Sequence, residues 1–442
     1  MVRHAALILS LALAACTQAD LSRVRVEQGE AQGVARDGVR VFRSLPYAAA
    51  PVGDLRFRGP QPAPVWQGVR DATQPGPLCT QNTAGAEWGP WTGAFAPHGP
   101  VSEDCLTLSI WTPARNASER LPVMVWIPGG GFTDGGEAMS VYDGEALARR
   151  GVIVVTINYR VNAFGLLVHS ALEVEPDGAR GNYLLRDAIA ALQWVQTNIQ
   201  AFGGDPARVT IAGQSAGGAI AYALLDAPQA TGLFAGAILQ SFPPGSHTLP
   251  DRATAEASGA RLTGEADTAA ELRALPAERV LEWHDGLDLH VDNVLVSDAA
   301  FATPPYLNDV PIMAGITADE LSFLSPNLER YHRDAEPFGT PFAALYPAND
   351  DASGADAFLR SNRERAMVGL ERWARATQGG APLYLYLWTH TPPGPNSQAF
   401  RAFHSSEVIY MFGSLNAAPE RGFTDEDHAI SDRMLDLWAN FV

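Results

Sequence analysis

Three short runs of apolar and β-branched residues, at positions 123–127, 152–157 and 209–212, constrain the fold of this chain most strongly. Continuous runs of this kind, bounded by Gly, Pro or Asn, are typical of strands buried on both faces of a parallel sheet. Between the last two runs, apolar residues recur on one helical face: Leu184, Leu185, Ala188, Ile189, Leu192, Val195 and Ile199. A strand, a crossover helix and a second strand form a βαβ unit. The sequence therefore predicts an α/β fold with a doubly wound, mostly parallel central sheet and helices on both faces.

The remaining sequence gives no reason to divide the chain. No internal repeat, low-complexity tract or long linker occurs in the 442 residues, so we predict a single α/β domain over residues 33–442. Residues 251–298 are more polar and have a helical pattern, and we interpret them as an inserted helical cap over the sheet edge. The Gly- and Pro-rich segments 74–100 and 391–396 are expected to be loops around the entrance of a site.

The first residues have the pattern of an export signal. Arg3 precedes an apolar run at 5–13 that is too short to span a bilayer, as in a secretory signal. Residues 13–16, Leu-Ala-Ala-Cys, resemble a bacterial lipobox, in which Cys16 becomes the lipidated first residue. The alternative is ordinary cleavage after the Ala-Leu-Ala motif at 12–14. We expect a signal peptide at 1–15, a tether at 16–32, and an exported protein that is lipid-anchored on a bacterial envelope or else periplasmic or secreted.

Export also affects how the other two cysteines are interpreted. In an oxidising compartment Cys79 and Cys105 are expected to form a disulfide, which would close a loop of 105 − 79 = 26 residues. The alternative is a pair of buried free thiols. Trp88, Trp91 and Phe95 lie inside this loop, where they either line a pocket or pack the loop onto the body.

The composition excludes several chemistries. All 31 basic residues are arginine, and with 49 acidic residues the formal net charge is −18. A Walker-A loop, a Schiff-base lysine and a serine–lysine dyad are excluded because each needs a lysine. The acidic balance argues against a nucleic-acid partner. The His- and Asp-containing run at 283–292 matches no metal-binding spacing, so we expect a solvated loop there, and no metal or cofactor.

The motif Gly-Gln-Ser-Ala-Gly at residues 213–217 has the context of a nucleophile elbow, because it follows the run 209–212 and precedes a helical run at 219–225. In such an elbow the serine occupies a strained turn at positive φ, and the flanking glycines let strand and helix approach without Cβ clashes. The helix that begins there directs backbone N–H groups toward a developing oxyanion. This placement favours Ser215 as a nucleophile over an incidental serine in a Gly-rich turn.

A second glycine cluster, Gly-Gly-Gly at residues 129–131, follows the run 123–127. Backbone amides can hold an anionic oxygen only where no side chain obstructs them. We therefore predict that Gly130 and Gly131 form an oxyanion hole together with the amide of Ala216.

These motifs resemble those of the type-B carboxylesterases, the cholinesterase/carboxylesterase family of α/β-hydrolases. Residues 202–217 fit the extended serine signature of that family. Residues 102–108 resemble its second signature, whose cysteine closes the first family disulfide, which implies Cys79–Cys105. Blocks at 42–47, 55–57, 158–160 and 181–182 are also similar. The resemblance extends from about residue 33 to the C-terminus. Members of the family usually continue further, so we expect either a protein that is short for the family or a truncated sequence.

The resemblance also implies the partners of the serine. In this fold the order along the chain is serine, acid, histidine. Glu320 matches the family acid and His404 the family histidine. Asp319 is an adjacent competitor that the sequence does not separate from Glu320, and His390 and His428 also lie downstream of the acid.

Two further residues stand at positions next to this catalytic set. Ser241 resembles a serine that steadies the acid and the histidine. Gln214 stands where cholinesterases carry a glutamate, and the missing negative charge disfavours a choline-type cationic substrate.

The resemblance thus implies a serine hydrolase that cleaves small-molecule carboxylic esters through an acyl-enzyme intermediate with a Ser-His-Glu triad. One alternative is a non-catalytic, cholinesterase-like surface binding protein. The other is an amide or carbamate hydrolase that uses the same site. The expected membrane contact is limited to a lipidated Cys16.

Overall fold

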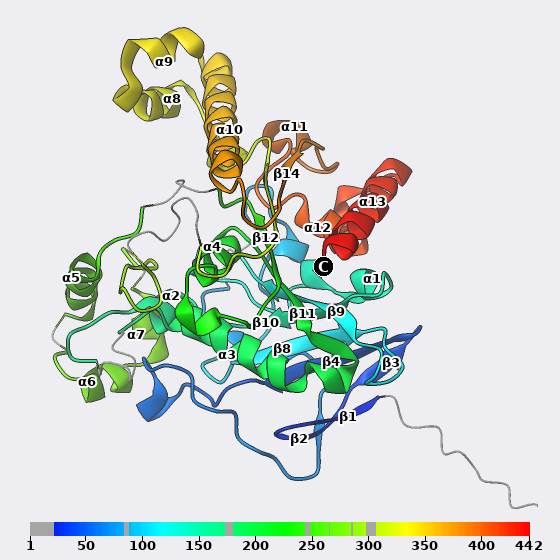
Figure 1. Cartoon of the computed structure of the whole chain (residues 1–442). Helices are drawn as coiled ribbons and strands as arrows, with labels where there is room; N and C mark the ends of the chain where they lie inside the picture. Colours follow the sequence, from blue (N-terminus) through cyan, green and yellow to red (C-terminus); the bar gives the residue numbers. More distant parts are fainter. Residues whose placement is uncertain are drawn as a thin grey trace, which may run out of the picture.

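The computed structural model describes residues 22–83, 88–172, 180–243, 248–264, 266–283, 286–297 and 306–442, and a nine-stranded sheet lies at its centre (Figure 1). The strands of this sheet are β3 (Val34–Arg36), β4 (Val39–Pro46), β8 (Thr107–Thr112), β9 (Leu121–Ile127), β10 (Ile153–Ile157), β11 (Gly204–Gln214), β12 (Gly236–Gln240), β13 (Ile312–Thr317) and β14 (Leu383–Trp388). Their spatial order is β14-β13-β12-β11-β9-β10-β8-β4-β3. The strands from β14 to β10 are parallel, and β8, β4 and β3 continue the sheet in antiparallel pairs. The predicted mostly parallel sheet is confirmed.

Both faces of this sheet are buried, as the apolar runs require. Helices α3 (Tyr183–Asn198) and α4 (Ala216–Leu224) cover one face, and α1 (Glu145–Ala148), α12 (Val408–Met411) and α13 (Asp425–Phe441) cover the other. Alternate residues of β9 enter the two cores, because neighbouring side chains of a strand point to opposite faces. Val123 and Val125 pack with α3 and α4, whereas Met124 and Trp126 pack with the helices of the second face.

Two short pairings lie outside the main sheet. Strands β1 (Arg23–Val26), β2 (Gly29–Gln32) and β5 (Val69–Asp71) form a small sheet near the start of the described chain. Strands β6 (Leu78–Cys79) and β7 (Val101–Ser102) pair near the two ends of the disulfide loop. The other described residues of that loop are mostly irregular, as the Gly- and Pro-rich composition predicts.

The polar segment after β12 is helical, as predicted. It contains α5 (Arg252–Thr263), α6 (Ala269–Ala274) and α7 (Ala277–Leu281), which lie together on one side of the molecule (Figure 1). Leu272 and Val280 pack there with Phe164 of α2 (Asn162–Leu166).

A second helical segment follows β13, which the sequence patterns do not identify. Helices α8 (Leu328–Ala335), α9 (Gly339–Leu345) and α10 (Asp351–Ala376) extend away from the sheet and share a small core of their own. In that core Tyr331, Phe342 and Phe358 pack together. The chain returns through β14 and the short helix α11 (Ser397–Phe400) toward α12 and α13.

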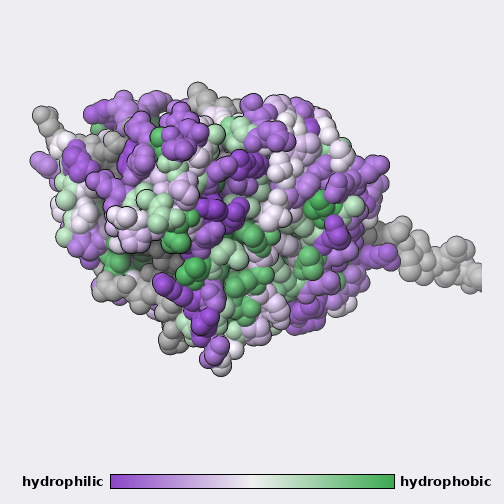
Figure 2. All heavy atoms as spheres, turned by 90° about the horizontal axis from the view of Figure 1, so that it is seen from above, coloured by the Kyte–Doolittle hydropathy of each residue, from purple (hydrophilic) through white to green (hydrophobic). Residues whose placement is uncertain are grey.

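Strand β14 is an edge strand, and it exposes large apolar side chains such as Tyr384 and Leu385. The face seen from above carries many hydrophilic residues, with small groups of hydrophobic residues between them (Figure 2). Among the described residues, no helix is both long enough and apolar enough to cross a bilayer.

Candidate active site

Ser215 occupies a sharp turn between β11 and α4. Its backbone has φ 56° and ψ −125°, and its N–H donates a hydrogen bond to the carbonyl of Gln240 on the neighbouring strand (2.9 Å). The flanking glycines are required by close backbone approach. A Cβ atom on Gly213 would lie 2.3 Å from the Gly217 carbonyl oxygen, and one on Gly217 would lie 2.0 Å from the carbonyl oxygen of Ile127. The predicted strand–turn–helix arrangement is therefore present around Ser215.

The loops after β13 and β14 bring an acid and a histidine together. The two loops are joined by a β-bridge between Asp319 and Phe403, in which the Asp319 N–H donates to the Ala402 carbonyl (3.0 Å). Oε2 of Glu320 forms a hydrogen bond with Nδ1 of His404. The second oxygen of Glu320 accepts a hydrogen bond from the Thr317 N–H at 2.7 Å, which fixes the carboxylate.

Asp319 has a different environment, although it is adjacent to Glu320. Its Oδ2 accepts a hydrogen bond from the Ala402 N–H at 3.3 Å, and its Oδ1 lies 3.9 Å from Arg401 Nη1. Asp319 thus holds the two loops together, whereas Glu320 contacts the imidazole.

The competing histidines lie in other surroundings. His390 Nε2 is 2.7 Å from Asp427 Oδ1, an oxygen that also accepts a hydrogen bond from Tyr410 at 2.6 Å. His428 is exposed on α13. Neither residue lines the pocket that contains Ser215.

Charge coupling shifts both members of the Glu320–His404 pair. Burial disfavours the charged imidazole, but the facing Glu320 carboxylate and its hydrogen bond outweigh this, so the pKa of His404 lies above its ordinary value. Burial likewise disfavours the Glu320 carboxylate, yet the facing imidazole and the hydrogen bonds of the site lower the pKa of Glu320. The pair therefore favours an ionised acid beside the histidine.

The far nitrogen of His404 contacts Gln214. The side-chain amide Nε2 of Gln214 lies 3.1 Å from His404 Nε2. Ser215 lines the same pocket, but among the hydrogen bonds of the described residues none joins its hydroxyl to His404. A neutral His404 with its proton on Nδ1 accepts a hydrogen bond from the Gln214 amide at Nε2. This hydrogen bond must break when Nε2 takes a proton from another group.

The glycine loop after β9 lines the same pocket as Ser215. Gly130 and Gly131 both have positive φ, at 125° and 60°. In the described part of the chain, the amide N–H groups of Gly130, Gly131 and Ala216 donate no hydrogen bond. Amides at a helix start and in such a loop are free to bind an anionic oxygen.

The pocket has a volume of about 280 Å³, and five of its 17 described lining residues are aromatic. Its aromatic residues come from the disulfide loop, the segment after the glycine loop and the segment after Glu320: Trp88, Trp91, Phe95, Tyr142 and Phe323. The first three therefore line the pocket, one of the two expectations for them. Asp134 is the only carboxylate among the described lining residues, which include no arginine, and burial raises the pKa of Asp134.

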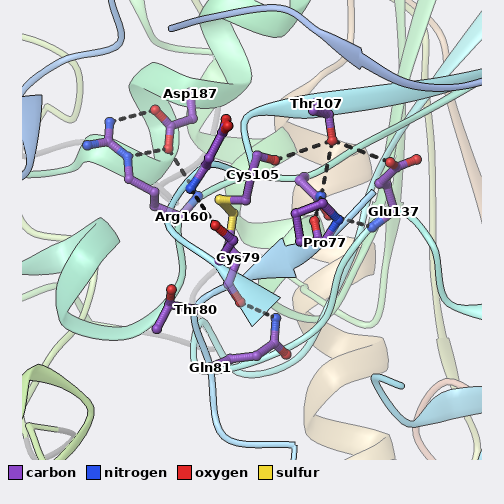
Figure 3. The surroundings of a disulfide bond; sticks show 12 residues. Pro77, Cys79, Thr80, Gln81, Cys105, Thr107, Glu137, Arg160 and Asp187 are labelled. Atoms are coloured by element: carbon purple, nitrogen blue, oxygen red, sulfur yellow. Dashed lines mark hydrogen bonds and ion pairs between the residues drawn. A yellow bond between two sulfur atoms is a disulfide. The ribbon is translucent and has the colours of Figure 1, made fainter. Parts of the chain in front are cut away.

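A disulfide joins Cys79 to Cys105, and several buried polar contacts surround it (Figure 3). Gln81 and Gly135 exchange two hydrogen bonds of 2.8 Å, which attach the disulfide loop to the glycine loop. On the other side of the disulfide, Arg160 and Asp187 form a buried ion pair at 2.6 Å.

Two polar residues lie behind the Glu320–His404 pair. Ser241 lies beside Glu320 and contributes to lowering the pKa of that carboxyl, although its buried hydroxyl is not in hydrogen-bonding geometry. Glu407 is fully buried, burial raises its pKa to about 7, and it accepts a hydrogen bond from Gln240 at 3.0 Å. Glu407 lies three positions after His404 and belongs to no recognisable sequence pattern, so the sequence alone does not identify it.

Two sequence predictions concern residues outside this site. Cys16 and the signal segment lie outside the described residues. The described residues contain no group of three or more His, Cys, Asp or Glu placed to hold a metal ion, and His284 and Asp285 of the run 283–292 are not among them. The expectation of a solvated loop is wrong for the described part of this run, because His290 and Asp292 are buried and accept hydrogen bonds from the Asn182 side chain.

Comparisons with known proteins agree with this fold. The model of the carboxylesterase family matches residues 20–338 and 361–442. Fumonisin B1 esterase of Sphingopyxis macrogoltabida is 36% identical over 450 residues, covering 94% of this chain and 81% of the relative. Para-nitrobenzyl esterase of Bacillus subtilis (strain 168) is 32% identical over 453 residues, covering 95% and 89%.

A solved structure of PNB esterase has a TM-score of 0.78 and 30% sequence identity, and the match covers 95% of this chain and 90% of that chain. The internal residues that the family model leaves unmatched, 339–360, lie in the helical segment α9–α10. The chain belongs to the carboxylesterase family and is a carboxylic ester hydrolase with the α/β-hydrolase fold.

Proposed function

We propose that this esterase works through an acyl-enzyme intermediate on Ser215. His404 Nε2 takes the hydroxyl proton as Ser215 Oγ attacks the ester carbonyl carbon, and Glu320 orients the imidazole and stabilises its charged form. The tetrahedral intermediate collapses, the C–O bond to the alcohol breaks, and His404 gives its proton to the leaving alkoxide. A water molecule, activated in the same way, then releases the acid and restores Ser215.

The oxyanion of both tetrahedral intermediates would be held by backbone amides. Gly130, Gly131 and Ala216 supply N–H groups without other partners in the described chain, beside a nucleophile that begins α4. Donors that are already in place need no reorganisation when charge develops on the oxygen.

One observation carries the proposal: the Glu320–His404 hydrogen bond forms beside a serine in an elbow turn, from three separate loops of the sheet. Two loops joined by a bridge place the acid and the imidazole together, and the imidazole and Ser215 line one pocket. A histidine without a catalytic role would not need an acid partner, a bridged pair of loops and a serine in the same pocket.

The pocket supports a neutral ester with an apolar or aromatic group as substrate. Five aromatic side chains line it, and the described lining has one carboxylate and no arginine to bind an acidic substrate. The relatives are named for a fumonisin B1 ester and a para-nitrobenzyl ester. We propose small-molecule esters for the present chain, and the lining of its pocket favours uncharged ones.

The test is turnover of p-nitrophenyl butyrate by the wild type and by Ser215→Ala, with labelling by a fluorophosphonate probe. We expect the variant to lose at least about 10³-fold in kcat and to lose labelling, while its thermal unfolding midpoint stays unchanged. Activity retained in Ser215→Ala would refute the proposed mechanism. A wild type that neither turns over esters nor reacts with the probe would favour a non-catalytic binding role, and turnover of the matching amide or carbamate at a higher kcat/KM would favour that substrate class.

We also propose that the chain is exported and tethered through Cys16. The support is the short apolar run and the Leu-Ala-Ala-Cys sequence at 13–16. Expression in a Gram-negative host followed by mass spectrometry of the mature N-terminus tests this. A lipidated Cys16 that is lost in Cys16→Ser supports the tether, whereas cleavage after Ala14 without a lipid contradicts it.

A further inference from the structure

The disulfide loop contacts the backbone that carries His404. Indole Nε1 of Trp91 donates hydrogen bonds to Ser405 Oγ at 2.9 Å and to the carbonyl oxygen of His404 at 3.2 Å. The Ser405 hydroxyl in turn donates to the same carbonyl oxygen. A side chain more than three hundred positions away thus completes a small hydrogen-bond network at the histidine.

This network surrounds a strained turn. Ser405 is buried and has φ 71°, in the left-handed region that residues other than glycine adopt at a cost. The direction of the His404 side chain depends on this backbone, because Ser405 is the next residue. A turn of this kind persists only where its surroundings hold it, and Trp91 supplies one such contact.

The Trp91 ring also contacts both loops that form the Glu320–His404 pair. Its centroid lies 6.4 Å from that of His404 in an edge arrangement, and 4.9 Å from that of Phe323, which follows Glu320 in the same loop. Phe323 completes the triangle at 6.0 Å from His404. The indole therefore fills the space beside the imidazole and limits its movement away from Glu320.

We propose that Trp91 is a positioning residue for His404, which holds the left-handed turn at Ser405 and thereby keeps the imidazole aligned with Glu320. The inference rests on the proposed function of His404 as the base. Trp91 forms or breaks no bond of the substrate in this role. Its effect passes through the orientation of His404, so it should alter kcat and the pH profile more than KM.

Two other tryptophans allow this role to be separated from simpler ones. Trp88 contacts Trp91 (4.7 Å) and Phe323 (5.8 Å), but in the described part of the chain it donates no hydrogen bond to the His404 loop. Trp66 is half-buried like Trp91 and donates to the Glu30 carbonyl at 2.7 Å, outside the pocket. Trp88→Phe therefore disturbs the aromatic wall, and Trp66→Phe removes a comparable indole hydrogen bond elsewhere.

The experiment measures kcat and KM for p-nitrophenyl butyrate between about pH 5 and pH 9, with active sites counted by fluorophosphonate labelling. We expect Trp91→Phe to lower kcat roughly ten- to a hundredfold with little change in KM, and to move the acid limb to lower pH because the histidine loses its alignment with Glu320. Trp88→Phe should act mainly on KM, and Trp66→Phe should leave both constants unchanged.

A rescue variant tests the turn itself. Glycine adopts φ 71° without strain, so Ser405→Gly in the Trp91→Phe background should restore part of the lost kcat. Equal kcat and equal pH profiles for Trp91→Phe and Trp88→Phe, with all active sites counted, would overturn the proposal, as would a missing rescue by Ser405→Gly.

Two further controls keep the outcome interpretable. If Trp91→Phe does not fold, a variant with 3-benzothienylalanine at position 91 takes its place in the same comparison. This residue keeps the bicyclic ring but lacks the N–H donor. Ser215→Ala separates the two proposals. An active Ser215→Ala refutes the proposed function, whereas an inactive one together with a normal Trp91→Phe refutes only the role of Trp91.

Discussion

The proposal of Glu320 as the acid is supported by the direction of two neighbouring side chains. Sequence alone leaves Asp319 and Glu320 as competitors, because both carboxylates fit the order serine, acid, histidine. In the structure Asp319 takes part in the bridge to the His404 loop, whereas Glu320 reaches the imidazole. The difference depends on how two loops pair, which no local pattern records.

Exchange of each carboxylate for its amide tests this assignment. Glu320→Gln should lower kcat by about 10³- to 10⁴-fold, because the amide cannot hold the imidazole tautomer or stabilise its charged form. Asp319→Asn keeps an acceptor for the Ala402 N–H and should retain kcat within about tenfold. The measurement is steady-state turnover of p-nitrophenyl butyrate. An inactive Asp319→Asn beside an active Glu320→Gln would reverse the assignment.

The surroundings of His404 predict how kcat/KM depends on pH, and its contact with Gln214 gives a way to change that dependence. The proposed base His404 can accept a proton only when neutral, and Glu320 holds its pKa above the ordinary value of about 6.5. The ratio kcat/KM should therefore fall as the pH drops through a midpoint above that value. Gln214→Glu adds a second carboxylate near Nε2, which favours the imidazolium, so the midpoint should move to higher pH.

The matched control is Gln214→Met, which removes the amide without adding charge. Its midpoint should stay close to that of the wild type. Profiles of kcat/KM for the three proteins would contradict the argument if the glutamate variant moved to lower pH or did not move.

At the scale of elements, the strands were the most predictable part of the fold. Continuous apolar runs at β9, β10 and β11 follow from burial on both faces. The sequence did not predict the segment α8–α10. Its apolar residues, such as Tyr331 and Phe342, pack with one another in a small separate core. The contact of Trp91 with the His404 loop joins distant positions, so only the folded chain reveals it.

The disulfide that closes the loop can be removed, and its contribution to the free energy of unfolding can be measured directly. In the chain-entropy model, a bond across 26 residues stabilises the folded state by about 3–4 kcal/mol. The double variant Cys79→Ser/Cys105→Ser should lose this amount in the free energy of unfolding, measured in urea. The wild type in a strong reductant should lose a similar amount, whereas the double variant should not respond to reductant. Equal stability of the oxidised wild type and the double variant would contradict the expectation.

At the scale of the whole molecule, buried acids make stability depend on pH. Glu137 is 1% exposed, and burial raises its pKa to about 7, against about 4.3 in an unfolded chain. The folded state therefore keeps this proton longer than the unfolded state. The contribution of Glu137 to stability is lost as the pH rises from about 4 to about 7 and does not return at higher pH.

The neutral variant Glu137→Gln should remove this dependence. At pH 9 we expect it to raise the free energy of unfolding by about 1–3 kcal/mol relative to wild type, with a much smaller difference at pH 5. The exposed Glu371→Gln serves as control and should change little at either pH. Urea unfolding at both pH values measures the effect, and a Glu137→Gln variant that is less stable at pH 9 than at pH 5, relative to wild type, would contradict it.

The arrangement of the sheet has a consequence for how this enzyme acquires activity. Ser215 follows β11, while Glu320 and His404 lie in the loops after β13 and β14, at separations of 320 − 215 = 105 and 404 − 320 = 84 residues. Strand β14 is at the edge and pairs with β13 alone. A refolding chain can therefore bury most of its core before it has a working base. The return of ester turnover after dilution from denaturant would report the docking of this edge strand, while tryptophan fluorescence reports the earlier collapse.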